Sequence, residues 1–353
     1  MWGPCTATGG CPAATITLSA CFSPADAKAL MGRFDLCKTY PATIQREIQR
    51  EKLTECYQYD TLYEHLKKNP SGVTMALVNT QKNRERDDYS FANINLLGKC
   101  NTNCFFCLGL DLAGVIDDQN QLAIPFAEWK NFETFLKKCK DNRIRKIYIT
   151  GQNTDSLMYR CLEQLIDFLH AQDFAVGLRT NGYLALARME LINRCELSAG
   201  YSIHTLSPVT NRMIMGRDDL PDWDSIIPAT QRPRVSIVLN RCNKQEFFEL
   251  LRYVAKFENV RYIQIRRVST DTRNDLLMPD MVVYEEIYSQ VRNIFPLKRR
   301  FATDAEVYEI YGKDVVFWRT IKTSVNSMNY FTDDTVSDMY FIVEGYLKYR
   351  TQC

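Results

Sequence analysis

The sequence lacks long apolar runs and has almost no excess of charge of either sign. No stretch of its 353 residues approaches the roughly 18 consecutive apolar residues that a membrane-spanning helix needs. Lys and Arg number 44 against 42 Asp and Glu, so the net charge gives no reason to expect a nucleic acid or a membrane as a partner. The N-terminus has no basic cluster followed by an apolar run, which a secretory signal would show. These absences predict a soluble, cytoplasmic protein.

Histidine is scarce, with 3 residues, whereas cysteine is abundant, with 13. An odd number of cysteines in a long chain without a signal peptide argues against a secreted disulfide framework. Hydrophobic residues make up 46% and charged residues 24%, a composition typical of a globular chain with a sizeable core.

The first part of the chain, residues 1–88, predicts a mainly helical extension. Its helical patterns are Pro24–Phe34, Pro41–Lys52 and Asp60–Lys68, and the charged run Gln81–Asp88 is typical of a solvated linker.

Residues 89–280 instead alternate short apolar runs with amphipathic stretches, which indicates βαβ units and a parallel sheet. Six such units predict an α/β fold, an open or closed α/β barrel rather than a two-domain doubly wound fold. The candidate strands are Phe91–Leu97, Lys146–Thr150, Ala175–Arg179, Ala199–His204, Arg234–Leu239 and Arg261–Val268.

Residues 281–353 predict an α+β tail that packs across an open side of the barrel. Its expected elements are a helix over Val283–Phe295, a hairpin around Gly312 and a final helix from Val336 to Leu347.

Three cysteines lie together after the first strand, in the pattern Cys100-x3-Cys104-x2-Cys107. Thiolates are soft ligands, and three in one short loop are able to hold one metal ion or three corners of an iron–sulfur cube. A structural zinc favours C-x2-C pairs and needs a fourth ligand, and the sequence has no second pair. A cube held by three cysteines leaves one iron for a ligand that is not protein.

This cysteine loop resembles that of the radical S-adenosylmethionine (radical SAM) superfamily, in which an aromatic residue commonly precedes the third cysteine, here Phe106. The resemblance covers roughly residues 89–270, and three later motifs add to it. They are Gly151-Gln152-Asn153 after the second strand, Thr180-Asn181-Gly182 after the third, and Ser202 with His204 on the fourth. Their order is most similar to the branch that contains the molybdenum-cofactor cyclase and peptide-modifying enzymes.

The resemblance implies a partial (β/α)6 TIM-like barrel. It also implies one [4Fe–4S] cluster held by Cys100, Cys104 and Cys107, with S-adenosylmethionine (SAM) bound to its free iron. It implies that reductive cleavage of SAM yields a 5′-deoxyadenosyl radical, which abstracts hydrogen from the substrate. An electron donor such as flavodoxin or ferredoxin is implied as a partner. The cofactor-binding residues implied are Phe106, Gly151, Gln152, Asn153, Asn181, Ser202 and His204. A structural hydrogen-bonding role for His204 is favoured over that of a general base.

Two departures from the family pattern bear on function. Gln152 and Asn153 replace the second Gly and the Glu of a Gly-Gly-Glu turn, so a carboxylate contact to SAM is lost or becomes an amide contact. Few cysteines follow residue 161, namely Cys195, Cys242 and Cys353, which predicts that the tail holds no auxiliary cluster.

Arg266 and Arg267 end the sixth strand, where alternation places one inward and one outward. One of them is a candidate to bind SAM or an anionic group of the substrate. A salt bridge beneath the tail is an equal alternative.

The substrate predicted is a small metabolite of a specialised, natural-product pathway, and the alternative is a ribosomally made peptide. Two classes without radical chemistry stay open. One is a zinc or iron–sulfur module that binds a partner, and the other is a redox-sensing protein that forms a disulfide between Cys104 and Cys107.

Overall fold

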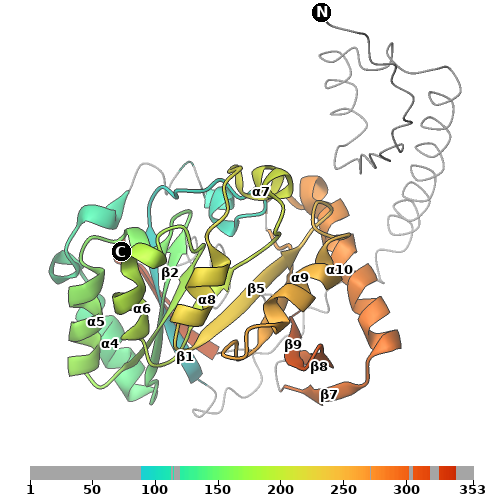
Figure 1. The fold of residues 1–353 in the computed structure, drawn as a ribbon. Coiled ribbons are helices and arrows are strands. Elements are labelled where there is room, and N and C mark those ends of the chain that lie inside the picture. Colours follow the sequence, from blue (N-terminus) through green and yellow to red (C-terminus); the bar gives the residue numbers. More distant parts are fainter. Residues whose placement is uncertain are drawn as a thin grey trace, which may run out of the picture. The chain divides into compact units, whose positions relative to one another are not determined.

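The structure is a computed structural model that describes residues 89–112, 114, 120–270, 272–301, 305–318 and 326–338 (Figure 1). The helical extension predicted over residues 1–88 lies outside the described residues. Within the described residues, no helix is both long enough and apolar enough to cross a membrane.

Six parallel strands form the centre of the sheet in the order of the sequence. Every predicted strand is confirmed, with ends that differ by a few residues. The strands are β1 (Tyr89–Leu97), β2 (Lys146–Gln152), β3 (Ala175–Thr180), β4 (Ala199–Ser202), β5 (Pro233–Leu239) and β6 (Ile263–Arg267).

Helices connect these strands and cover the outer face of the sheet (Figure 1). Most pack an apolar stripe against the strands, as Phe135 and Cys139 of α4 do, whereas Ile214 and Met215 of α7 pack against Phe106 of the cysteine loop. The helices are α4 (Phe132–Asp141), α5 (Leu162–Ala171), α6 (Met189–Asn193), α7 (Pro208–Met215), α8 (Trp223–Ala229), α9 (Phe247–Ala255) and α10 (Asn274–Ile294). Short 3-10 turns are η3 (Leu108–Leu112), η5 (Gln121–Ala123), η6 (Phe126–Glu128), η7 (Ser156–Met158) and η8 (Leu186–Arg188).

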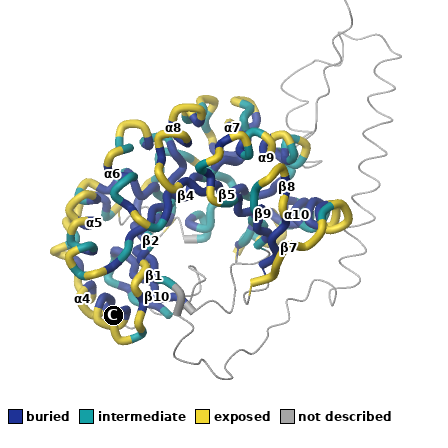
Figure 2. The backbone as a smooth tube through the Cα atoms, turned by 60° about the horizontal axis from the view of Figure 1, so that its bottom comes forward, coloured by how far each residue is buried: buried dark blue, intermediate teal, exposed yellow. Residues whose placement is uncertain are grey.

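The C-terminal segment extends the sheet at both edges. Strand β9 (Lys313–Trp318) pairs in parallel with β6, and β10 (Asn326–Phe331) pairs in parallel with β1. The remaining strands β7 (Leu297–Arg300), β8 (Glu306–Ile310) and β11 (Val336–Ser337) complete an open sheet of 11 strands (Figure 2). Because these strands share the sheet of the core, the division between residues 89–280 and 281–353 stays a prediction.

Two predicted helix boundaries in the tail are wrong. Helix α10 begins at Asn274 instead of Val283, because Pro279 lies within its second turn and removes one hydrogen bond without ending the helix. The final helix predicted from Val336 starts instead as strand β11, and its part beyond 338 lies outside the described residues. The hairpin at Gly312 is confirmed, with positive φ at both Tyr311 and Gly312.

The two faces of the central sheet differ in chemistry. Alternate residues such as Ile94, Ile149 and Leu178 are fully buried in the apolar layer beneath the helices. The intervening residues, such as Asn95, Thr150 and Arg179, face inward and line a cavity. We call this concave surface the inner face.

Candidate functional site

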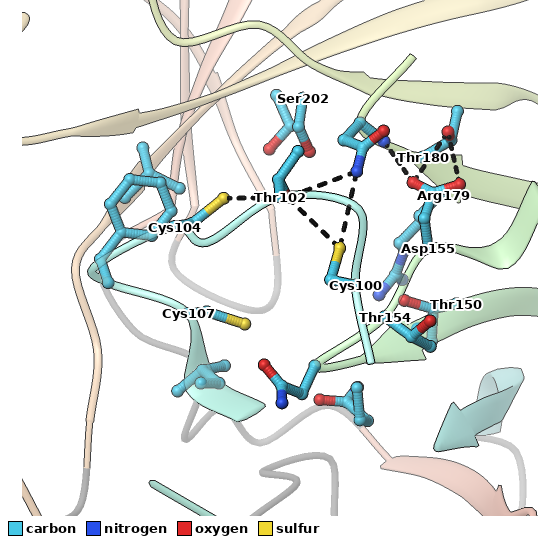
Figure 3. Close-up of a pocket in the computed structure, with 18 of the residues that line it drawn as sticks. Cys100, Thr102, Cys104, Cys107, Thr150, Thr154, Asp155, Arg179, Thr180 and Ser202 are labelled. Carbon is cyan, nitrogen blue, oxygen red and sulfur yellow. Dashed lines mark hydrogen bonds between the residues drawn. The ribbon is translucent and has the colours of Figure 1, made fainter. Parts of the chain in front are cut away.

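The cavity lies where the motif residues of the strand ends meet the cysteine loop (Figure 3). Because parallel strands present their carboxyl ends at one edge of the sheet, residues far apart in the sequence come together there. Every predicted cofactor-binding residue lines the cavity, as do Arg266 and Arg267.

The cysteine loop is anchored by helix α7. The backbone N–H groups of Asn103 and Phe105 donate to the carbonyls of Met215 and Ile214, at 2.8 and 3.1 Å. These carbonyls end the helix and have no partner within it, so the loop satisfies them. The helix stops at Gly216, whose φ of 71° favours glycine.

The three cysteine side chains line the cavity from one short loop, which ends in a turn from Cys104 to Cys107. Cys107 N–H donates to the Cys104 carbonyl at 2.9 Å, which closes the turn. The Thr102 hydroxyl lies 3.2 Å from the sulfur of Cys100 and 3.7 Å from that of Cys104 (Figure 3). The Asn181 amide donates to Asn101 Oδ1 at 2.7 Å and approaches Cys100 Sγ at 3.7 Å.

The donor set fits an iron–sulfur cluster. Burial raises the pKa of all three thiols, that of Cys104 to about 12, so a thiolate here needs a cationic partner. Iron bound there would supply that positive charge. Within the described residues, no three His, Cys, Asp or Glu side chains converge on a point that holds a single metal ion. A cube meets each thiolate at a different iron and does not require that convergence.

A cationic side chain next to helix α10 also holds the loop. Arg273, at the N-terminus of α10, donates to the carbonyls of Phe105 and Cys107 at 2.7 and 2.6 Å. Its Nε lies 2.5 Å from the fully buried carboxylate of Asp111, which also accepts from Thr270. Sequence reasoning missed Arg273, because 166 residues separate it from Cys107 and no local pattern marks the contact.

Asp155 is a second residue that sequence reasoning missed. Its buried carboxylate accepts hydrogen bonds from Leu157 N–H at 2.9 Å, Asn181 N–H at 2.6 Å and the Thr180 hydroxyl. Burial raises the pKa of the carboxyl despite these bonds. Asp155 thereby fixes the turn after β3 that presents Asn181 to the cysteine loop. The signal that could have identified Asp155 from the sequence is an acidic residue so close to the Gly151 turn.

The Gly151 turn is tightly packed. A Cβ on Gly151 would lie 2.1 Å from the carbonyl oxygen of Thr154, so only glycine fits. The side-chain amide of Gln152 is buried and donates to Asn95 Oδ1 at 3.1 Å, across to strand β1. Gln152 is therefore engaged within the sheet. Asn153 has a left-handed backbone, with a φ of 53°, and lines the cavity.

Phe106 and His204 pack against each other, with ring centroids 5.0 Å apart in an edge-to-face arrangement. Burial lowers the pKa of His204 to about 3, so the imidazole is neutral. Its Nδ1 accepts from the Val238 N–H at 3.2 Å, as a structural histidine would. Ser202 points into the cavity beside the cysteine loop (Figure 3).

The two arginines that end β6 have different surroundings. Arg266 pairs with Val238 of β5 and Trp318 of β9. Arg267 lies 3.7 Å from Glu285 of α10, which is the salt-bridge alternative for this residue. Sequence reasoning also missed Arg179, which lines the cavity from β3.

Two observations bear on the alternatives without radical chemistry, the redox-sensing protein and the partner-binding module. All described cysteines are free thiols, including Cys104 and Cys107. A partner-binding module would leave the cavity, and the motif residues that line it, without a role.

The fold is an open barrel whose six central strands are parallel, and the three-cysteine loop follows the first of them. These are the features by which the chain resembles radical SAM enzymes, as its sequence predicts. No protein-family model matches the sequence. No curated protein matches it either.

Solved structures of similar fold include Streptococcus suis SuiB bound to S-adenosylmethionine, at 16% identity and a TM-score of 0.45. That match covers 73% of this chain and 59% of the SuiB chain. SuiB bound to its precursor peptide SuiA matches at 15% identity, with coverage of 86% and 73% and a TM-score of 0.48. The Escherichia coli radical SAM enzyme HemN, a coproporphyrinogen III oxidase, matches at 8% identity, with coverage of 67% and 64% and a TM-score of 0.39. At such identities the functional residues are assigned from this chain's own geometry.

Proposed function

We propose that this chain is a radical SAM enzyme that cleaves SAM reductively and directs a 5′-deoxyadenosyl radical to a carbon of its substrate. The observation that carries the proposal is the loop of three cysteines, held at one end of a cavity lined by the later motif residues. A [4Fe–4S] cluster bound there would supply the electron and the free iron for SAM.

The chain's own residues have distinct roles in this proposal. Cys100, Cys104 and Cys107 hold iron, and Phe106 excludes water beside them. The backbone of Gly151 and Asn153 meets the methionyl end of SAM.

Further polar contacts to SAM come from the neighbouring strand ends. Asn181 and Ser202 contact its polar groups, while the Gln152 side chain braces the turn through Asn95. Neutral His204 orients Phe106 and needs no proton transfer.

The substrate proposed is a small metabolite of a natural-product pathway, with a flavodoxin or ferredoxin as electron donor. A ribosomally made peptide is the alternative. SuiB, one of the structures of similar fold, was solved with its precursor peptide.

The test is anaerobic reconstitution of the full chain with iron and sulfide, followed by dithionite and SAM. We expect about four irons per chain and formation of 5′-deoxyadenosine. Zinc bound in place of iron would instead support the partner-binding module.

Two variants sharpen the test. Cys107→Ala should abolish cluster binding and 5′-deoxyadenosine formation. Cys139→Ala, at a buried free thiol of α4, should keep both. Full iron content and activity in Cys107→Ala would refute the assignment.

A further inference from the structure

Two arginines lie on the inner face of the sheet without a carboxylate partner among the described residues. Arg179 of β3 and Arg234 of β5 pair with Gly200 of β4, one from each side. The guanidinium of Arg179 lies 5.3 Å from the ring centroid of Tyr148. Arg234 donates to Gln264 Oε1 at 3.0 Å.

The two cations differ in exposure. Arg234 is 5% exposed, whereas Arg179 is half-buried, and its buried Nε has no hydrogen-bond partner. Burial of a charge without a counter-charge is costly, so two like charges on one surface call for an anion. Asp155 is the one carboxylate among the described cavity-lining residues, and three neighbouring residues already donate to it.

Two glycines make room for the side chains of Arg234 and Tyr148. A Cβ on Gly200 would lie 2.6 Å from Nη2 of Arg234, and a Cβ on Gly177 would lie 2.5 Å from the Tyr148 ring. Because Gly177 of β3 and Gly200 of β4 have no side chains, Tyr148 and Arg234 extend across the inner face of these two strands. Larger residues at these two positions would displace Arg234 and Tyr148.

The two guanidinium groups lie one layer below the positions assigned to SAM. Arg179 reaches toward Tyr148, four residues before Gln152 along β2. Arg234 lies over Gly200, two residues before Ser202 on β4. A group that meets them enters the barrel deeper than the SAM-contacting strand ends.

We infer that the substrate carries an anionic group, a carboxylate or a phosphate, that binds to Arg179 within the positive field of Arg234. This inference deepens the proposed function and rests on it. Arg179 makes the direct contact because it lines the cavity, whereas Arg234 is not among the residues that line it. The guanidinium fork suits either anion through paired N–H donors.

The test measures the melting temperature of the anaerobic holoprotein in phosphate, succinate or chloride at equal ionic strength. We expect phosphate or succinate to raise it relative to chloride, since a ligand of the folded state stabilises that state. In Arg179→Met, the anion concentration needed for the same rise in melting temperature should be at least tenfold higher. Without added anion, the melting temperature of this variant should not fall, because the substitution removes a buried unpaired charge.

Arg252→Met is the matched control. Arg252 lies 5.2 Å from the ring centroid of Tyr311 but projects from the exposed surface of α9, so its loss should leave the anion response unchanged. Should Arg179→Met fail to fold, Arg179→Lys, which keeps the charge, should keep part of the response.

Two results would overturn the inference. One is an anion response absent from the wild type or retained in Arg179→Met. The other is a tenfold loss of SAM affinity in Arg179→Met with the anion response intact, which would assign the cation to the carboxylate of SAM. A chain that binds four irons and forms 5′-deoxyadenosine without an anion response would leave the proposed function standing.

Discussion

Arg273 and Cys107 are joined by a 2.6 Å hydrogen bond from the guanidinium to the carbonyl of the third cysteine. The same guanidinium holds the carbonyl of Phe105 and is itself fixed by Asp111. The first turn of α10 therefore acts on the cysteine loop, although the two are far apart in the sequence. This contact makes Arg273 a positioning residue for the cysteine loop and, in the proposed function, for the cluster that the loop would hold.

Arg273→Ala should lower the iron retained per chain after desalting and shift the reduction potential of the cluster to more negative values. The first effect follows from lost hydrogen bonds to the loop, and the second from a lost positive charge beside it. Arg194→Ala, which breaks an exposed pair with Glu163, should change neither. An unchanged potential in Arg273→Ala would contradict the positioning role.

Asp155→Asn should lower the free energy of unfolding by about 2–4 kcal/mol. One of the two carboxylate oxygens that now accept hydrogen bonds becomes an NH2 group, which faces the same donors and cannot accept from them. Urea denaturation measures this loss. Asp222→Asn is the control: Asp222 caps α8 by accepting from the Ser225 N–H at 3.2 Å, and Asn caps helices equally well. Equal stabilities of the two variants would refute the bracing role of Asp155.

Gly200→Ala should destabilise the fold by about 1–3 kcal/mol, because the added Cβ meets the Arg234 guanidinium. In an Arg234→Ala background the same substitution should cost less. Gly177→Ala meets the Tyr148 ring instead and should gain no relief from Arg234→Ala. A double-mutant cycle on unfolding free energies checks both statements.

The surroundings of Glu306 predict a contribution to the free energy of unfolding that is lost in acid. Its burial raises the pKa, but hydrogen bonds from Tyr288 and Tyr308 and the cation of Arg300 outweigh this and lower the pKa to about 2. Because the folded-state pKa lies below the unfolded value, the stabilisation is present above about pH 4.5 and is lost as the pH falls toward 2.

Glu306→Gln should therefore lose about 2–3 kcal/mol relative to the wild type at pH 7 and converge with it near pH 2. Glu309→Gln, on the exposed face of the same strand, should show a smaller difference at pH 7. Unfolding free energies measured across this pH range check the prediction.

The six central strands and the cysteine loop could be predicted because their signals are local. A buried parallel strand is a short apolar run, and three cysteines within eight residues leave few chemical readings. Helix α7 was missed because it spans only Pro208–Met215 and carries a weak apolar stripe. Its carbonyls nevertheless hold the loop.

The contacts that were missed are long-range. The pairing of β10 with β1 joins residues more than 230 positions apart, as in the hydrogen bond from Asn93 to Asn329. Arg179 had a local signal, since a charged residue within a buried strand must face the inner side of the sheet. Its lack of a carboxylate partner, by contrast, emerges only when the neighbouring strands are placed.

The position of β10 has a consequence for the order in which the chain is made. Strand β1 is synthesised early, yet one of its edges is completed only when residues 326–331 have left the ribosome. Until then, that edge presents unpaired N–H and C=O groups next to the cysteine loop. Such late closure slows folding and leaves the nascent chain exposed to edge-to-edge association. A truncation before residue 326 would therefore leave the cysteines in place but β1 open to other chains.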